Sequence, residues 1–273
     1  MRAEDLPLAG CTILAVFAHP DDESLACGGT LARAADAGAR VILLCASRGE
    51  RGFISDPALV PDGDLGGVRT RELNEAANIL GVAEVLVFSH PDGNLRWADV
   101  PEFHTEIARA IRDYRPDAVI TFAEDGLYWH PDHIGVHERT CAAVRSFGDA
   151  APSLYYVTMP KGVMRGLVES AIATGWTPPN SGPGSIVPDA FGVLAGTPSF
   201  VVDVRDWVVR KLAALGCHHT QMGTSNPFAS LDLAEARRWL GVEHFRRAWL
   251  HPGRSVLEQL GEPVPGSNEP QRT

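Results

Sequence analysis

Histidine recurs in the same tripeptide at three places along the chain. The sequence His-Pro-Asp begins at His19, His90 and His130, which are three of the ten histidines present. A histidine and a carboxylate close together in sequence can bind a metal ion or exchange protons with a substrate. The three tripeptides are therefore the places where chemistry is expected.

The first and third tripeptides contain the spacing of a metal site. In the run HPDDE, His19 and Asp22 are spaced to chelate one ion, and His133, just after the third tripeptide, would be the third ligand at the start of a helix. Two imidazoles and one carboxylate leave a position for water, which suits catalytic Zn²⁺. The same donor set also serves Fe²⁺. The sequence thus predicts a zinc site, with iron as the alternative metal.

The residues beside the predicted ligands have acid–base chemistry. Asp21 lies next to the ligand Asp22, where a general base for water is needed. His130, three residues before the third ligand, is expected to face the same cavity and to donate a proton or hydrogen bond to the reacting group. We expect the Asp132 carboxylate to hold the imidazole of His130 in the donor tautomer, as carboxylates around metal sites do.

Both motifs also have a purely structural interpretation. The run Pro-Asp-Asp-Glu-Ser is a good helix start, because carboxylates are favourable near the N-terminus of a helix. Pro in a turn and Asp at an N-cap need no catalysis in the segment 130–133 either. Two such motifs at strand ends in one chain favour the catalytic interpretation. For His90 the structural interpretation is favoured, as a loop residue that shapes the rim of the site.

The elements that must position these residues follow from the apolar pattern. Short apolar runs predict buried parallel strands at about residues 12–18, 40–46, 84–89 and 117–122. Helical periodicity predicts helices at about residues 24–37, 69–80, 101–114 and 133–147. Strands alternating with helices indicate an α/β fold, a Rossmann-like, mostly parallel sheet with helices on both faces. The motifs then follow the carboxyl ends of three strands, where such sheets bind ligands.

The second half of the chain has a less regular pattern. A fifth strand is predicted in SLYYVTM, and apolar residues return in PSFVVDV and in a helix that begins near Asp206. Residues 161–197, rich in Gly, Pro, Ser and Thr, are expected to form a long functional loop. We expect residues 1–260 to form a single α/β domain and residues 261–273 to be a disordered tail.

The composition disfavours two classes of partner. The 273 residues include 24 Lys+Arg against 34 Asp+Glu, a formal net charge of −10, so binding to nucleic acid is not expected. Apolar runs are far shorter than the roughly 20 residues that cross a bilayer, so no membrane partner and a cytoplasmic location are predicted. The expected partner is a small molecule, and the sequence is compatible with a homo-oligomer.

Two longer motifs resemble a known family. AHPDDESLACGGT at residues 18–30 and YWHPDHIGV at residues 128–136 closely resemble the zinc-dependent N-acetylglucosaminyl deacetylases of the LmbE and PIG-L type. This family includes the deacetylases of mycothiol and bacillithiol biosynthesis and relatives that tailor glycopeptide antibiotics. R-x-x-E-L at residues 69–73 and H-x-T-Q at residues 218–221 are weaker matches, and the resemblance covers about residues 10–222.

The resemblance implies roles for further residues. It supports the metal, base and acid roles inferred above, and it implies an amino-sugar conjugate as the substrate. Arg69 and Asp92 match positions that bind sugar hydroxyls, Tyr128 matches a mobile tyrosine that reaches toward the carbonyl oxygen, and His218 is expected to line the cavity. Ala26 stands where the amidase that cleaves mycothiol S-conjugates has lysine, which favours the deacetylase branch.

The predicted function is removal of the acetyl group from an N-acetylglucosamine conjugate. One alternative is an amidase or deacylase that tailors a glycopeptide or a thiol conjugate. Another is a non-catalytic sugar- or nucleotide-binding α/β module, although the first strand is not followed by the G-x-G-x-x-G fingerprint of dinucleotide binding.

Overall fold

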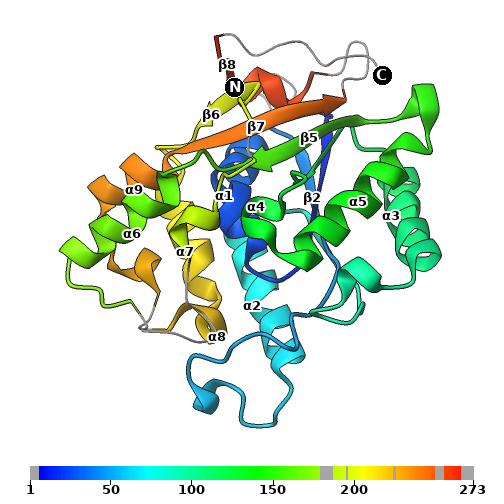
Figure 1. Ribbon diagram of the computed structural model, residues 1–273. Helices are drawn as coiled ribbons and strands as arrows, with labels where there is room; N and C mark the ends of the chain where they lie inside the picture. The colour runs from blue at the N-terminus through cyan, green and yellow to red at the C-terminus, as the bar shows by residue number, and fades with distance from the viewer. Residues whose placement is uncertain (1–5, 179–186, 195, 224–225, 250–254, 266–273) are drawn as a thin grey trace.

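One sheet runs through the protein in the computed structural model, which describes residues 6–178, 187–194, 196–223, 226–249 and 255–265 (Figure 1). In the described ranges the sheet has eight strands. In spatial order these are β3 (Glu84–Val87), β2 (Arg40–Cys45), β1 (Thr12–Phe17), β4 (Ala118–Phe122), β5 (Ser153–Thr158), β7 (Val242–Trp249), β6 (Phe200–Asp203) and β8 (Glu262–Pro263).

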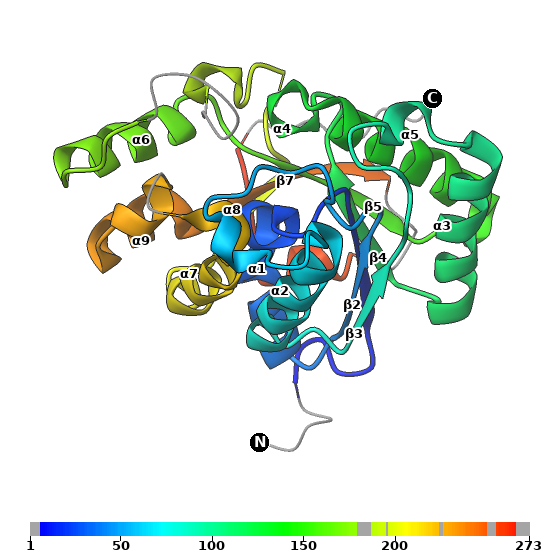
Figure 2. The same cartoon turned by 90° about the horizontal axis from the view of Figure 1, so that it is seen from below.

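The first five of these neighbours form a parallel sheet with helices on both faces. Strands β3, β2, β1, β4 and β5 all pair in parallel, and β1, β2 and β4 are almost entirely buried, as expected of strands covered on both sides. Figure 2 shows one group of helices on each face. One group consists of α1 (Asp22–Asp36), α2 (Leu65–Leu80) and α7 (Val208–Cys217). The other consists of α3 (Val100–Tyr114) and α5 (Pro131–Arg145). The predicted mostly parallel α/β fold is confirmed.

Shorter helices complete the described part of the chain. The α-helices are α4 (Gly126–Trp129), α6 (Val163–Ala173), α8 (His219–Met222) and α9 (Leu233–Leu240). The 3₁₀ turns are η2 (Pro57–Leu59), η3 (Leu95–Trp97), η4 (Gly148–Ala150), η5 (Pro188–Ala190), η6 (Pro227–Ser230) and η7 (Leu257–Leu260). No helix in the described ranges combines the length and the apolar character needed to cross a bilayer.

The predicted long loop contains a helix instead. Residues 163–173 form α6, whose apolar side chains Met164, Leu167, Val168 and Ala171 are buried at helical spacing. The glycines and prolines around this segment obscure that spacing in the sequence. Residues 179–186, in the middle of the predicted loop, lie outside the described residues.

The end of the chain adds strands that the apolar pattern does not predict. Strand β7 lies antiparallel between β5 and β6. Glu262 and Pro263 pair with β6 as the edge strand β8, so the expected tail does not begin at residue 261. Residues 266–273 of that tail lie outside the described residues.

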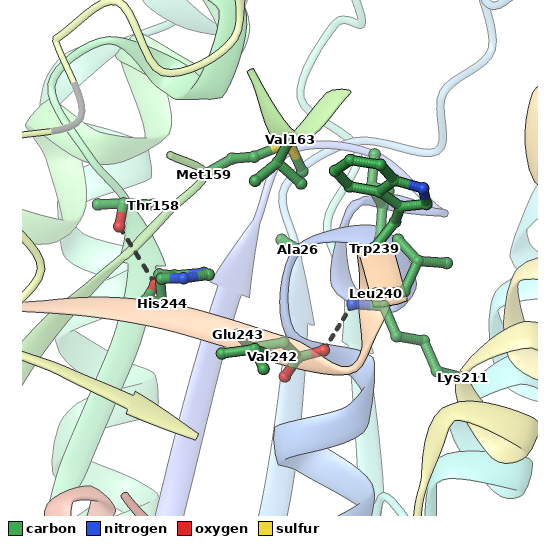
Figure 3. A pocket seen from close by; sticks show the side chains of 11 residues that line it. Ala26, Thr158, Met159, Val163, Lys211, Trp239, Leu240, Val242, Glu243 and His244 are labelled. Atoms are coloured by element: carbon green, nitrogen blue, oxygen red, sulfur yellow. Dashed lines mark hydrogen bonds and ion pairs between the residues drawn. The ribbon is translucent and has the colours of Figure 1, made fainter. Parts of the chain in front are cut away.

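Helix α1 is broken, and a buried ion pair holds the break. Cys27 leaves the helical conformation (φ −151°, ψ 23°), and the Glu243 carboxylate accepts hydrogen bonds from the backbone N–H groups of Gly29 at 3.0 Å and Thr30 at 2.7 Å. The Lys211 ammonium lies 2.5 Å from the same carboxylate (Figure 3). The pocket beside this pair has a volume of about 20 Å³, room for about one water molecule. It is therefore too small for a sugar.

Replacing Lys211 with Met should lower the free energy of unfolding by about 3–5 kcal/mol, because Glu243 would remain as a buried charge without its cation. Urea denaturation measures the effect. In the double variant Lys211→Met/Glu243→Gln much of the loss should be recovered, since no charge is then buried. A change of less than about 1 kcal/mol in the single variant would show that the Glu243 carboxylate does not depend on this partner.

Candidate active site

The carboxyl ends of three strands bring the predicted residues to one edge of the sheet. His19 follows β1, Asp92 follows β3, and the segment from α4 to the first turn of α5 follows β4. Helices α4 and α5 pack against one another there (Figures 1 and 2). Pro131 is in the first turn of α5, so His133 projects from the beginning of that helix.

The three predicted metal ligands lie at the corners of a small triangle. His19 Nδ1 is 3.3 Å from Asp22 Oδ2, His133 Nε2 is 3.1 Å from Asp22 Oδ1, and the two ring nitrogens are 3.3 Å apart. All three side chains are buried. Ligand atoms about 2.0–2.1 Å from a tetrahedral Zn²⁺ ion lie about 3.3 Å from one another. The spacing therefore fits a divalent cation.

The outer hydrogen bonds of the two imidazoles also fit a cation. His133 Nδ1 lies 3.0 Å from the carbonyl oxygen of Gly126, so it carries the proton and leaves the Nε2 lone pair toward the triangle. His19 Nε2 lies 3.2 Å from both Asp132 Oδ2 and Asp92 Oδ1, which leaves its Nδ1 lone pair toward the triangle. Two lone pairs and a carboxylate thus converge without a proton between them, and metal-binding histidines have this kind of outer partner.

His130 lies close to the triangle, but its lone pair is already used by the backbone. Its ring nitrogen is within 4.8 Å of those of His19 and His133, so the three could form an alternative ligand set. However, His130 Nδ1 accepts a hydrogen bond from the backbone N–H of Asp132 at 3.2 Å. Burial and the neighbouring imidazoles lower the pKa of His130 to about 4. The ring is therefore neutral at pH 7 with its proton on Nε2, where it donates rather than binds metal.

The expected partnership between the Asp132 carboxylate and His130 is wrong. The carboxylate accepts hydrogen bonds from the backbone N–H groups of Gly93 and Leu95 at 2.7 and 2.9 Å and contacts His19 rather than His130. Asp132 thus orients a predicted ligand through its carboxylate and sets the tautomer of His130 through its backbone. Its side chain is fully buried, so contact with a substrate is not expected.

Asp92 also faces His19 rather than open space. One carboxylate oxygen lies against the His19 ring and the other accepts a hydrogen bond from the backbone N–H of Arg51 at 2.8 Å. Burial opposes ionisation, but the hydrogen bonds from His19 and from the backbone N–H of Arg51 lower the pKa of Asp92 to about 2. Both oxygens therefore have protein partners, which does not match the expected contact with sugar hydroxyls.

Arg69 is placed against the predicted base instead of facing solvent. Its guanidinium donates to Asp21 Oδ2 at 3.1 Å, to the carbonyl oxygen of Pro20 at 2.6 Å and to that of Gly49 at 2.9 Å. A Cβ at Gly49 would overlap this guanidinium, so the close approach requires glycine. Burial raises the pKa of Asp21 and the charge on Arg69 opposes the rise. Arg69 therefore positions Asp21.

Tyr128 lies against the imidazoles of His130 and His133. Its ring makes edge contacts with His130 and His133 at centroid distances of 5.8 and 5.2 Å and stacks on Phe191 at 4.8 Å. The adjacent Leu127 and Trp129 both have positive φ angles, of 66° and 68°. Such angles cost about 1–3 kcal/mol each, so the packing around this segment must hold them.

His218 and His90 are both buried and have carboxylate partners outside the triangle. His218 has no exposed surface, and its Nε2 lies 3.1 Å from Glu23 Oε1. It does not line the cavity, contrary to expectation. His90 Nε2 lies 2.5 Å from a Glu106 carboxylate oxygen and its ring contacts Phe103. His90 is thus outside the ligand triangle, in accord with its structural interpretation.

Glu23 is a residue of the site that the sequence analysis does not predict. Its carboxylate is fully buried behind the first turn of α1 and joins Asp21, Ser24 and His218. The signal available in the sequence is a third acidic residue in HPDDE, which the favourable electrostatics of a helix start also explain. Because its partner His218 is 195 positions away, the pairing could not be inferred from spacing.

Comparison with known proteins identifies the family. The model of the PIG-L protein family, described as GlcNAc-PI de-N-acetylase, matches residues 14–144. Two proteins named 1D-myo-inositol 2-acetamido-2-deoxy-alpha-D-glucopyranoside deacetylase are similar to this chain. The protein of Kineococcus radiotolerans is 35% identical, and the match covers 77% of this chain and 68% of that protein. The protein of Acidothermus cellulolyticus is 34% identical, and the match covers 86% of this chain and 87% of that protein. The conserved protein TT1542 from Thermus thermophilus matches structurally, with a TM-score of 0.57, 28% identity and coverage of 94% and 99%. The chain therefore belongs to the PIG-L family.

Proposed function

We propose that the protein is a metal-dependent hydrolase that removes the N-acetyl group from an N-acetylglucosamine conjugate. The observation that carries the proposal is the triangle of His19, Asp22 and His133, with the His130 ring against both imidazoles and Asp21 next to the ligand Asp22 in the chain. The names of the two curated relatives support an acetylated amino sugar linked to inositol as the substrate class.

The donor set favours Zn²⁺, with Fe²⁺ as the alternative. His19, Asp22 and His133 would hold the ion and leave a coordination position open. When bound, such an ion supplies a Lewis acid that makes water more acidic and polarises a carbonyl group. Asp132 and Asp92 hold the His19 ring in the tautomer that can coordinate. Elemental analysis of the purified protein identifies the metal.

Two side chains, Asp21 and His130, carry out the proton transfer and the hydrogen bonding of the proposed reaction. Asp21 accepts a proton from water as the water oxygen attacks the acetyl carbonyl carbon. His130 Nε2–H donates a hydrogen bond to the carbonyl oxygen as negative charge develops on it. The C–N bond then breaks, acetate leaves, and the proton held by Asp21 passes to the departing amine. One water is consumed, and the products are acetate and the free amino sugar.

A parallel substrate panel tests the proposal. We expect amine release from N-acetylglucosaminyl inositol, measured with an amine-reactive fluorophore, to exceed release from N-acetylglucosaminyl malate, an acylated glycopeptide and long-chain acyl glucosamines. Preference for the glycopeptide or a long-chain substrate would instead identify a tailoring deacylase. Failure to hydrolyse any member, in protein shown to contain metal, would contradict the proposed function.

A further inference from the structure

The backbone of Asp21 is strained at the point where the proposed base is needed. Its φ is 126° and its ψ −26°, in a region that residues with a Cβ rarely adopt. Asp21 occupies the N-cap position of α1 but makes no side-chain capping bond. The strained conformation instead turns its carboxylate toward Arg69. An aspartate that only capped the helix would bond to the backbone N–H groups of the first turn.

A fully buried carboxylate holds this backbone. Glu23 Oε2 accepts a hydrogen bond from the backbone N–H of Asp21 at 3.1 Å, while Oε1 accepts one from Ser24 Oγ at 2.5 Å. His218 Nε2 lies 3.1 Å from the same Oε1. Glu23 therefore binds the strained residue with one oxygen and is anchored through the other.

The residue that anchors Glu23 is 195 positions later in the chain. His218 follows the last turn of α7, and Glu23 is the only hydrogen-bond partner of its ring among the described residues, since Nδ1 has none. A buried ring nitrogen without a partner is unfavourable for stability. The placement of His218 leaves Nδ1 without a hydrogen bond but lets Nε2 donate one to the Glu23 carboxylate. The bond to Glu23 therefore explains the placement better than the hydrogen bonding of the whole ring does.

We propose that Glu23 and His218 are positioning residues that hold Asp21 in its strained conformation, so that the Asp21 carboxylate is aimed at the attacking water. This inference rests on the proposed role of Asp21 as general base. His218 fixes the Glu23 carboxylate, Glu23 fixes the backbone N–H of Asp21, and the carboxylate of Asp21 is then free of helix capping. Neither residue touches the substrate, and neither contacts the triangle of ligand atoms.

The test compares His218→Leu, which removes the donor to Glu23, with His218→Gln, which retains an N–H donor. In the metal-loaded protein we expect kcat to fall at least tenfold in His218→Leu, with KM and metal content unchanged, and to recover severalfold in His218→Gln. If His218→Leu does not fold, Glu23→Gln gives the same comparison, because it keeps the shape and weakens both contacts. A kcat within twofold of the parent in the folded variants would overturn the proposal.

Two controls separate positioning from stability and from the proposed function. Lys211→Met disrupts a different buried ion pair, in which Glu243 binds the break in α1, and it should lower the melting temperature while kcat of the folded protein stays within twofold. In an Asp21→Asn background, His218→Leu should cause no further loss, because the group it positions is already gone. A further tenfold loss there would overturn the positioning role, whereas full activity of Asp21→Asn alone would contradict the proposed function instead.

Discussion

Asp21→Asn is expected to lower kcat for amine release by about 10²–10⁴-fold while the protein still binds one metal ion. The amide keeps the size of the side chain and still accepts the hydrogen bond from Arg69, but it cannot take a proton from water. Because Asp21 is outside the triangle of ligand atoms, metal content should not change. Steady-state kinetics on the preferred panel substrate, with elemental analysis of the same sample, measures both quantities.

The variant Asp92→Asn is the control that separates loss of the base from loss of a negative charge. Asp92 is also a buried carboxylate beside His19, so its amide variant controls for the loss of one negative charge near the metal. We expect a smaller loss of activity for Asp92→Asn, accompanied by weaker metal binding. If Asp21→Asn retained parental kcat, another group would have to be the base.

His133→Ala is expected to abolish both metal binding and activity. Two remaining ligands bind a divalent ion far more weakly than three, and the variant also loses the hydrogen bond that holds the Gly126 carbonyl. The measurement is metal content after dialysis against a weak chelator, together with amine release. Added metal should restore little activity.

His90→Ala is the matched control for that variant. It removes a buried histidine from the same tripeptide at a position outside the triangle, where the ring contacts Glu106 and Phe103. We expect this protein to be less stable but to keep its metal. Equal loss of metal in both variants would mean that the dependence on His133 is structural, and the proposed ligand assignment would then fail.

The parallel half of the fold could be predicted because its signals are local. The buried strands read as continuous apolar runs, and Gly81 ends α2 in the left-handed conformation, with φ 79°, that favours glycine. Strand β7 gives no such signal. It contains Glu243, Arg246 and Arg247 among its eight residues, and the inward-facing Glu243 is tolerated only because Lys211 and two backbone N–H groups lie opposite.

The sequence predicts which residues form the metal triangle but not which hydrogen-bond partners the surrounding residues have. The spacing of His19, Asp22 and His133 relative to strand ends is visible in the sequence, and the structure brings these three together. The partners of Arg69 and Asp132 are not visible in the sequence. The long Arg69 side chain can point either into the site or behind it, and the partners of Asp132 are distant in the chain. Burial decides between the two, and burial depends on the packing of distant segments.

The antiparallel insertion of β7 determines the order in which the sheet can be completed. Within the described residues, β6 pairs only with β7 and β8, both of which follow it in the chain. A chain emerging from the ribosome can therefore assemble β1 to β5 early, but β6 has no strand to join until residues 242–249 are available. The same late strand delivers Glu243 to the break in α1. Truncation before Val242 would thus remove a strand from the interior of the sheet and release β6 from it, rather than trim a terminus.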